Sequence, residues 1–226
     1  MGRGRGDAVV GVISTLDKKT DEGEPVLRTA MTKLGALRDE EVTAHASTLA
    51  SATEYRGFIF DVLVDDIELA STSARMRREY IRHDDAVAVL AVRDGEGGEE
   101  VLLIRQYRHP VRRLMWEIPA GLLDVAGENP VEAAARELAE EADLGAAEFT
   151  FLASFYPSPG CSDEQLDIYL ARGVYAVETD FQREDEEEEI ETAWVPLRDV
   201  IAEVLAGNLH CPSLVTGVLA YAATLR

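Results

Sequence analysis

The spacing of apolar and polar residues predicts a strand-rich first half of the chain. Short runs rich in β-branched and aromatic residues predict strands, and the Gly-rich segment 94–98 between two such runs is typical of a hairpin. Two more strands are expected later, at 150–156 and 166–175. The strands predicted in the first half cover residues 58–69, 77–82, 86–92, 100–107 and 114–118.

One helix stands out in the middle of the chain. Asn129 can cap its N-terminus, Pro130 suits its first position, and Glu132 completes an Asn version of the capping box. Two more helices are expected at 197–206 and 213–225. Residues at helical spacing predict that the central helix buries an apolar stripe made of Val131, Ala135, Leu138 and Ala142.

The order of these elements predicts the domain organisation. Strands dominate first, one capped helix follows, and helices close the chain. This order favours a layered α/β domain with a mixed sheet, which can also be classed as α+β because parallel and antiparallel strands occur together. We assign residues 85–226 to this domain and residues 54–84 to a preceding β-segment. Residues 1–53 form an extension with little pattern, in which 40–52 predicts a weak helix.

Composition narrows the class of partner. The chain has 226 residues, 46% of them hydrophobic, which is enough for a core. Its 43 acidic and 22 basic residues give a formal charge of −21, which repels nucleic acid backbones, so no nucleic acid partner is expected. An anionic nucleotide remains acceptable if divalent cations reverse the local field. Two distant cysteines and the lack of a long apolar run predict a cytoplasmic protein without a membrane span.

The central helix concentrates negative charge. Glu137, Glu140 and Glu141 project from one narrow face, where each like-charge pair costs an isolated helix roughly 0.2–0.5 kcal/mol. A solvated acidic face is the ordinary interpretation of such a pattern. However, a Gly-containing loop leads into this helix, and Arg136 follows Glu128 by eight residues and can tether that loop. This context favours a site for a hard divalent cation with oxygen ligands.

The stretch 121–144 resembles the Nudix box, G-x5-E-x7-R-E-U-x-E-E-x-G-U, where U is aliphatic. It departs from the box at two points: one extra residue follows Gly121, and Asp143 replaces a Gly. Asp tolerates the positive φ that such a Gly often adopts, so we expect function to be kept. The form of the loop is similar to that of actinobacterial ADP-ribose pyrophosphatases. The positions that match the box are Glu128, Arg136, Glu137, Leu138, Glu140, Glu141 and Leu144.

The resemblance implies a fold and a metal site. The fold is the Nudix α/β/α sandwich with a mixed β-sheet. Glu137 and Glu141 would be the main ligands and catalytic carboxylates, Glu140 would assist, and the carbonyl of Ala120 would complete the set. The implied metal is Mg²⁺, with Mn²⁺ as an alternative. Glu128 would pair with Arg136 in a structural role.

Residues before the box point to the substrate. Arg105-Gln-Tyr-Arg-His-Pro110 is similar to a segment of ADP-sugar pyrophosphatases, and it implies that Arg108 contacts the substrate's phosphates or terminal ribose. A guanidinium offers a fork of donors suited to phosphate. Arg105 is placed in the same substrate-binding set, and Glu117 would orient Arg108 or a metal-bound water. Trp116 either stacks on adenine or lies in the core, and the core is favoured.

A loop after the box supplies a candidate base. Residues 158–164 resemble the Pro-Gly-x-Ser-x-Glu loop of the same subfamily, which puts Glu164 at the position of the proposed catalytic base. The acidic run 184–189, together with Glu191, is the alternative source of a base. His83 and His109 do not suggest a second constellation.

The expected activity is Mg²⁺-dependent hydrolysis of the pyrophosphate of a nucleoside diphosphate sugar. The favoured substrate is ADP-ribose, which would give AMP and ribose 5-phosphate. Other nucleotide sugars, oxidised nucleoside triphosphates and a non-catalytic ADP-ribose sensor stay open as alternatives. The subfamily also implies a homodimer, formed through strands within residues 54–84.

Overall fold

The computed structural model describes residues 38–179, 181 and 188–225. The first 37 residues of the predicted extension, and residues 184–187 of the acidic run, lie outside the described residues. The described residues divide into two compact units, one that contains residues 38–47 with Leu69–Ser73, and one that contains Thr48–Glu68 with the described residues after 73. In the smaller unit, the Ala70 N–H donates to the carbonyl of His45 at 3.0 Å.

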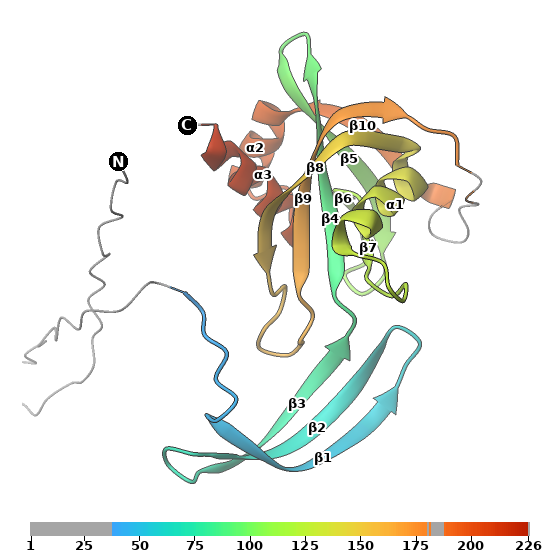
Figure 1. The fold of residues 1–226 in the computed structure, drawn as a ribbon. Helices are drawn as coiled ribbons and strands as arrows, with labels where there is room; N and C mark the ends of the chain where they lie inside the picture. The colour runs from blue at the N-terminus through green and yellow to red at the C-terminus, as the bar shows by residue number, and fades with distance from the viewer. Residues whose placement is uncertain (1–37, 180, 182–187, 226) are drawn as a thin grey trace, which may run out of the picture. The chain divides into compact units, whose positions relative to one another are not determined.

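A three-stranded sheet contains β1 (Ala46–Arg56), β2 (Phe60–Leu69) and β3 (Arg75–His83) in that order (Figure 1). The weak helix predicted at 40–52 is wrong, because β1 begins at Ala46 and its backbone pairs with β2. The apolar pattern of this segment is weak, so strand pairing overrides local helix preference. Antiparallel pairing of β2 with β3 places ion pairs directly opposite each other: Glu68–Arg75, Asp66–Arg77 and Asp61–Arg82.

The larger sheet is mixed, as the sequence predicts. Its central path runs β10-β5-β4-β9-β8, while β6 pairs with β5 and β7 pairs with β4. β4 and β9 run parallel, and the other described pairs in this sheet are antiparallel. Its strands are β4 (Ala86–Gly95), β5 (Gly98–Arg108), β6 (Arg113–Glu117), β7 (Ala120–Leu122), β8 (Leu144–Phe155), β9 (Leu166–Ala176) and β10 (Glu191–Pro196).

Helices cover both faces of this sheet (Figure 1). α1 (Pro130–Ala142) lies on one face, and α2 (Leu197–Leu205) with α3 (Pro212–Thr224) lies on the other. β4 is buried on both faces, since its alternate side chains pack against opposite helical layers. Val87 and Val89 join Leu138 of α1, whereas Ala88 and Leu90 join residues of α2 and α3, including Val200 and Leu214. The fold is therefore the predicted α/β/α sandwich.

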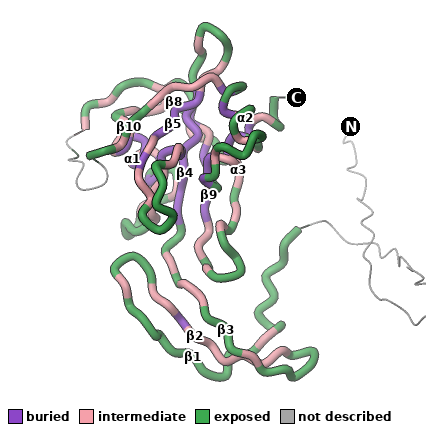
Figure 2. Tube along the Cα trace, turned by 180° about the vertical axis from the view of Figure 1, so that it is seen from behind, coloured by how far each residue is buried: buried purple, intermediate pink, exposed green. Residues whose placement is uncertain are grey.

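Figure 2 shows that burial is concentrated in β4, β5 and β9, whereas β1 is exposed along almost its whole length. None of the helices in the described part of the chain is long and apolar enough to cross a membrane. The predicted strands and the two C-terminal helices are found with boundaries shifted by a few residues. β7 and β10 were not predicted, because one is three residues long and the other follows the acidic run.

The buried face of α1 differs from the predicted stripe. Leu138 is buried as expected, but Val131 is 40% exposed and Ala135 and Ala142 are only partly buried. The residues that α1 buries are Ala133, Ala134, Glu137, Leu138 and Glu141. Two carboxylates therefore lie on the buried face of this helix, which apolar periodicity alone did not indicate.

Candidate active site

Both ends of α1 are fixed by the residues that the sequence singles out. The Asn129 side chain accepts hydrogen bonds from the backbone N–H groups of Val131 and Glu132, both at 3.0 Å. The Glu132 carboxylate accepts from the Asn129 N–H at 3.2 Å, which confirms the capping box. At the other end Asp143 adopts a left-handed conformation with φ 55°. Asp143 thus takes over the backbone geometry for which Gly is often used.

Arg136 ties the preceding loop to the helix. Its Nη2 atom donates to Glu128 at 3.0 Å and to the carbonyl of Leu122 at 3.4 Å, which confirms the predicted pair with Glu128. Its Nη1 atom donates to Glu137 and, at 3.1 Å, to Glu140. Hydrogen bonding from Arg136 lowers the pKa of Glu128. One guanidinium therefore offsets the like-charge repulsion among the helix carboxylates.

Glu137 and Glu141 are carboxylates in a largely dry environment, each with 8% of its surface exposed. The Glu141 carboxylate accepts a hydrogen bond from the Ala120 N–H at 2.9 Å, yet burial raises the pKa of Glu141 to about 8. Burial also raises the pKa of Glu137, and the charge of Arg136 opposes this shift. Burying Glu141 with a backbone N–H as its donor is costly, and a bound cation would reduce that cost.

The chemical type of the candidate ligand atoms fits a hard divalent cation. Glu137, Glu140, Glu141 and the carbonyl of Ala120 offer only oxygen, the ligand atom that Mg²⁺ prefers. Among the described residues, no three His, Cys, Asp or Glu side chains converge into a ready-made cage. Arg136 donates to Glu137 and Glu140, and the Ala120 N–H donates to Glu141. Each carboxylate keeps further lone pairs with which it could bind a cation.

Gly121 allows β7 to approach α1 closely. A Cβ atom at this position would overlap the carboxylate of Glu137. A Gly is therefore required here by close approach to a charged side chain rather than by an unusual φ.

We expect Gly121→Ala to push the Glu137 carboxylate out of place. Glu137 is an expected ligand, and disturbing the support of a ligand typically weakens metal affinity by about 10–100-fold, so the divalent-cation concentration for half-maximal activity should rise by about that factor. Gly97→Ala is the matched control, because a Cβ there makes only ordinary contact with the Arg198 side chain. Equal metal requirements in the two variants would contradict the expected contact.

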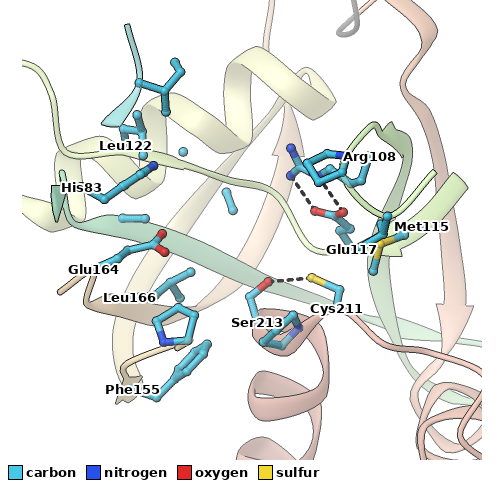
Figure 3. Close-up of a pocket in the computed structure, with 18 residues that line it drawn as sticks. His83, Arg108, Met115, Glu117, Leu122, Phe155, Glu164, Leu166, Cys211 and Ser213 are labelled. Carbon is cyan, nitrogen blue, oxygen red and sulfur yellow. Dashed lines mark hydrogen bonds and ion pairs between the residues drawn. The ribbon is translucent and has the colours of Figure 1, made fainter. Parts of the chain in front are cut away.

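A cavity of about 700 Å³ opens beside β7 (Figure 3). The Arg108 side chain lies in its wall and donates to the buried Glu117 carboxylate through Nε at 2.9 Å and Nη2 at 2.8 Å. The expected orientation of Arg108 by Glu117 is therefore found. The pKa of Arg108 is raised, mainly by its hydrogen bonds to Glu117. The negative charge of Glu141 on α1 adds to this rise. The apolar part of the wall includes Ile59, Val111, Met115, Leu122, Phe155 and Leu166.

Glu164 lines the same cavity, opposite Arg108 in Figure 3. Burial raises its pKa, as expected for a half-buried carboxylate in an apolar wall. The loop that carries it is held to the end of β3, because Ile81 and Cys161 share a backbone hydrogen bond of 2.8 Å and Asp163 accepts from the His83 N–H at 3.0 Å. His83 also lines the cavity, although no sequence motif singled it out.

Arg105 is not among the cavity-lining residues. It lies three residues before Arg108 on β5, so the two side chains project to opposite faces of the strand. Its guanidinium lies 5.6 Å from the centre of the Trp116 ring and 3.4 Å from the Glu191 carboxylate. Trp116 is partly buried against the core, as the favoured interpretation expects. Glu191, an alternative base, is engaged with Arg105, and residues 184–187 of the acidic run lie outside the described part of the chain.

A mixed sheet lies between helical layers, and a carboxylate-bearing helix lies beside a cavity, which agrees with the α/β/α sandwich implied by the resemblance of residues 121–144 to the Nudix box. The NUDIX domain model matches residues 82–210, which is more than half of the chain. The chain belongs to this family.

Relatives of known name agree with this assignment. An ADP-ribose pyrophosphatase of Mycobacterium tuberculosis is 37% identical, over 76% of this chain and 81% of its own length. An ADP-ribose pyrophosphatase of Bacillus subtilis is 40% identical, over 72% of this chain and 85% of its own length. The solved structure of an ADP compounds hydrolase superposes with a TM-score of 0.67 at 25% identity, covering 82% of this chain and 97% of the other. The chain is an enzyme of the Nudix pyrophosphohydrolase class.

Proposed function

We propose that the protein hydrolyses ADP-ribose to AMP and ribose 5-phosphate with Mg²⁺ as the metal and Mn²⁺ as a substitute. The observation that carries the proposal is the pair of buried carboxylates, Glu137 and Glu141, beside β7 in the wall of a cavity that Arg108 also lines. The names of the two pyrophosphatase relatives support ADP-ribose as the substrate. The cavity of about 700 Å³ is within the usual size for a small-molecule site.

The metal would be held by Glu137, Glu140, Glu141 and the carbonyl of Ala120. When bound, the metal neutralises pyrophosphate charge and lowers the pKa of the attacking water. Arg108 would bind a phosphate or the terminal ribose with its guanidinium fork, and Glu117 keeps that fork in place through two hydrogen bonds. Arg105, which points away from Arg108 along β5, has no step in this mechanism.

Glu164 would act as the general base. Its carboxylate lies in the cavity wall opposite Arg108, so a pyrophosphate held by Arg108 would lie between them (Figure 3). In the ionised form Glu164 would take a proton from the water that attacks phosphorus. The leaving phosphate then departs as AMP or as ribose 5-phosphate, according to which phosphorus is attacked.

The proposal includes the organisation of the enzyme. Residues 85–226 would form the catalytic domain and residues 54–84 a β-segment that joins two chains into a homodimer in the cytoplasm. Exposed apolar side chains at the turn between β1 and β2 support such a contact, since Tyr55, Phe58 and Ile59 are all more than half exposed.

A substrate panel tests the proposal. The purified protein is incubated with ADP-ribose, GDP-mannose, UDP-sugars and oxidised nucleoside triphosphates, each with Mg²⁺ or Mn²⁺, and products are separated by chromatography. We expect the highest kcat/KM for ADP-ribose, with AMP and ribose 5-phosphate formed in equal amounts. A higher kcat/KM for another nucleotide would show that the enzyme has a different substrate from ADP-ribose within the same family. Binding of ADP-ribose without any hydrolysis would instead indicate a sensor and overturn the proposal.

A further inference from the structure

Positive charge gathers around the turn between β5 and β6, in a chain whose formal charge is −21. Residues 101–116 contain no Asp or Glu, and their four arginines are Arg105, Arg108, Arg112 and Arg113. Arg105 lies 3.4 Å from the Glu191 carboxylate, and Arg108 is held by Glu117. Since an anionic substrate is repelled by most of an acidic surface, a cationic turn beside the cavity favours its approach at this point.

Arg113 projects to the same face of the sheet as Arg108. The two residues are directly opposite each other in the antiparallel register of β5 and β6, and opposite residues place their side chains on one face. Positions 113, 115 and 117 of β6 also share a face, and Met115 and Glu117 line the cavity beside Arg108 (Figure 3). Arg113 is not itself a lining residue, so it lies at the rim, one alternate position beyond Met115.

The Arg113 side chain is exposed, and within the described part of the chain no residue forms a hydrogen bond or ion pair with it. The turn that brings it opposite Arg108 is closed by the Arg112 N–H, which donates to the His109 carbonyl at 3.1 Å. Like charges directly opposite each other destabilise an antiparallel pair. Because the Glu117 carboxylate already accepts two hydrogen bonds from Arg108, an additional anion would relieve this repulsion.

We propose that Arg113 is a substrate-binding residue, whose guanidinium holds one phosphate of a nucleoside diphosphate at the cavity rim while Arg108 binds the adjacent phosphate. The inference rests on the proposed function, because a nucleoside diphosphate sugar supplies the two neighbouring phosphates. A guanidinium presents a planar fork of donors to phosphate oxygens. Opposite residues of an antiparallel pair have Cα atoms about 4.5–5.5 Å apart, which suits two phosphates joined by one oxygen.

A rim contact of this kind acts on binding rather than on the chemical step. An interaction made equally with the bound substrate and the transition state changes KM and leaves kcat unaltered. Salt should also weaken the contact, because Arg113 is exposed and the Debye length falls from about 10 Å at 0.1 M salt to about 3 Å at 1 M. The loss of Arg113 should therefore matter most at low salt.

The test compares Arg113→Gln with the wild type on ADP-ribose at saturating Mg²⁺, in about 0.1 M and about 1 M salt. Loss of one charge-assisted contact with phosphate should raise KM on the order of tenfold at the lower salt, and less at the higher salt, with kcat close to that of the wild type. Arg113→Lys keeps the charge but loses the fork, so its KM should lie between the two. An unchanged KM in Arg113→Gln would overturn the inference.

Arg198→Gln is the matched control. It removes the same charge from an exposed arginine, whose contacts are with the Gly97 carbonyl and Asp199 at the opposite end of β5 from Arg108. We expect the KM of the wild type for this variant. An equal rise of KM in Arg198→Gln and Arg113→Gln would show that the net charge of the protein is responsible, and the role of Arg113 would be wrong.

Calorimetric binding of ADP with Mg²⁺ measures the rim contact without turnover. ADP carries the two neighbouring phosphates, so its affinity should fall by a similar factor in Arg113→Gln. If the wild type did not hydrolyse ADP-ribose but this fall were found, the proposed function would fail and the rim contact would stand. Hydrolysis by the wild type, with KM and ADP affinity unchanged in Arg113→Gln, would overturn the rim contact alone.

Thermal melting separates binding from a structural role. Arg113→Gln removes a like charge opposite Arg108, so the variant should melt no lower than the wild type. A lower melting temperature together with a loss of kcat would show that Arg113 supports the fold, and would contradict its role in binding.

Discussion

Replacing Glu141 or Glu137 by Gln should lower kcat by about 10³-fold, which corresponds to about 4 kcal/mol of lost transition-state stabilisation. Both carboxylates are buried on the face of α1 that meets β7, so the change removes charge from a dry site where solvent cannot replace it. Steady-state kinetics over a Mg²⁺ titration measure the effect. The Mg²⁺ requirement should rise along with the fall in kcat.

Glu132→Gln is the control for these variants. It lies on the same helix and carries the same chemical change, and Gln also serves at that position of a capping box. We expect near-normal kcat for this variant. Metal-free Glu141→Gln should also melt no lower than metal-free wild type at pH 8, since it no longer buries a charge. A lower melting temperature with unchanged Mg²⁺ dependence would show that Glu141 is structural.

Glu164→Gln should lower kcat by about 10²–10⁴-fold while the Mg²⁺ requirement stays close to that of the wild type. Glu164 lies in the cavity wall rather than on α1, so its loss removes a proton acceptor without removing the proposed ligands. In the wild type, burial raises the pKa of Glu164. A base acts when ionised, so activity should be lost as pH falls through this raised pKa, at a higher pH than for an exposed carboxylate. This acid limb should be absent from the residual activity of the Gln variant.

Glu191→Gln tests the alternative source of a base. Glu191 begins β10 and is engaged with Arg105 on β5, away from the cavity lining. We expect it to retain most of the wild-type kcat. A large loss of kcat in Glu191→Gln, together with normal turnover in Glu164→Gln, would show that the general base comes from the segment before Trp194.

The parts of the fold predicted from sequence are those with strong local signals. Asn129, Pro130 and Glu132 mark the start of α1 because capping depends on neighbouring residues only. Alternating and continuous apolar runs likewise locate β4, β5 and β9. The segment that became β1 was misassigned, because its backbone is satisfied by pairing with β2, which no local pattern reveals.

The candidate site follows the same division. Glu137, Glu140, Glu141 and Arg136 were identifiable because their spacing along one helix defines their geometry. His83 was missed, since its place beside Glu164 depends on contacts between segments about 80 residues apart. Arg105 and Arg108 belong to the same sequence motif on β5. Only the alternation of side chains along the strand places them on opposite faces, with Arg108 toward the cavity.

Arg136 has a consequence for the order in which this enzyme is assembled. Its guanidinium already bridges Glu128, Glu137 and Glu140, so it serves as an internal counter-ion while the chain folds. In many small metal-binding domains the metal is needed for folding itself. Here Arg136 supplies part of the charge balance from within the chain, so part of the repulsion among the helix carboxylates is relieved before any metal binds. Glu141 lies outside this network, and its burial is the cost that an added cation would relieve.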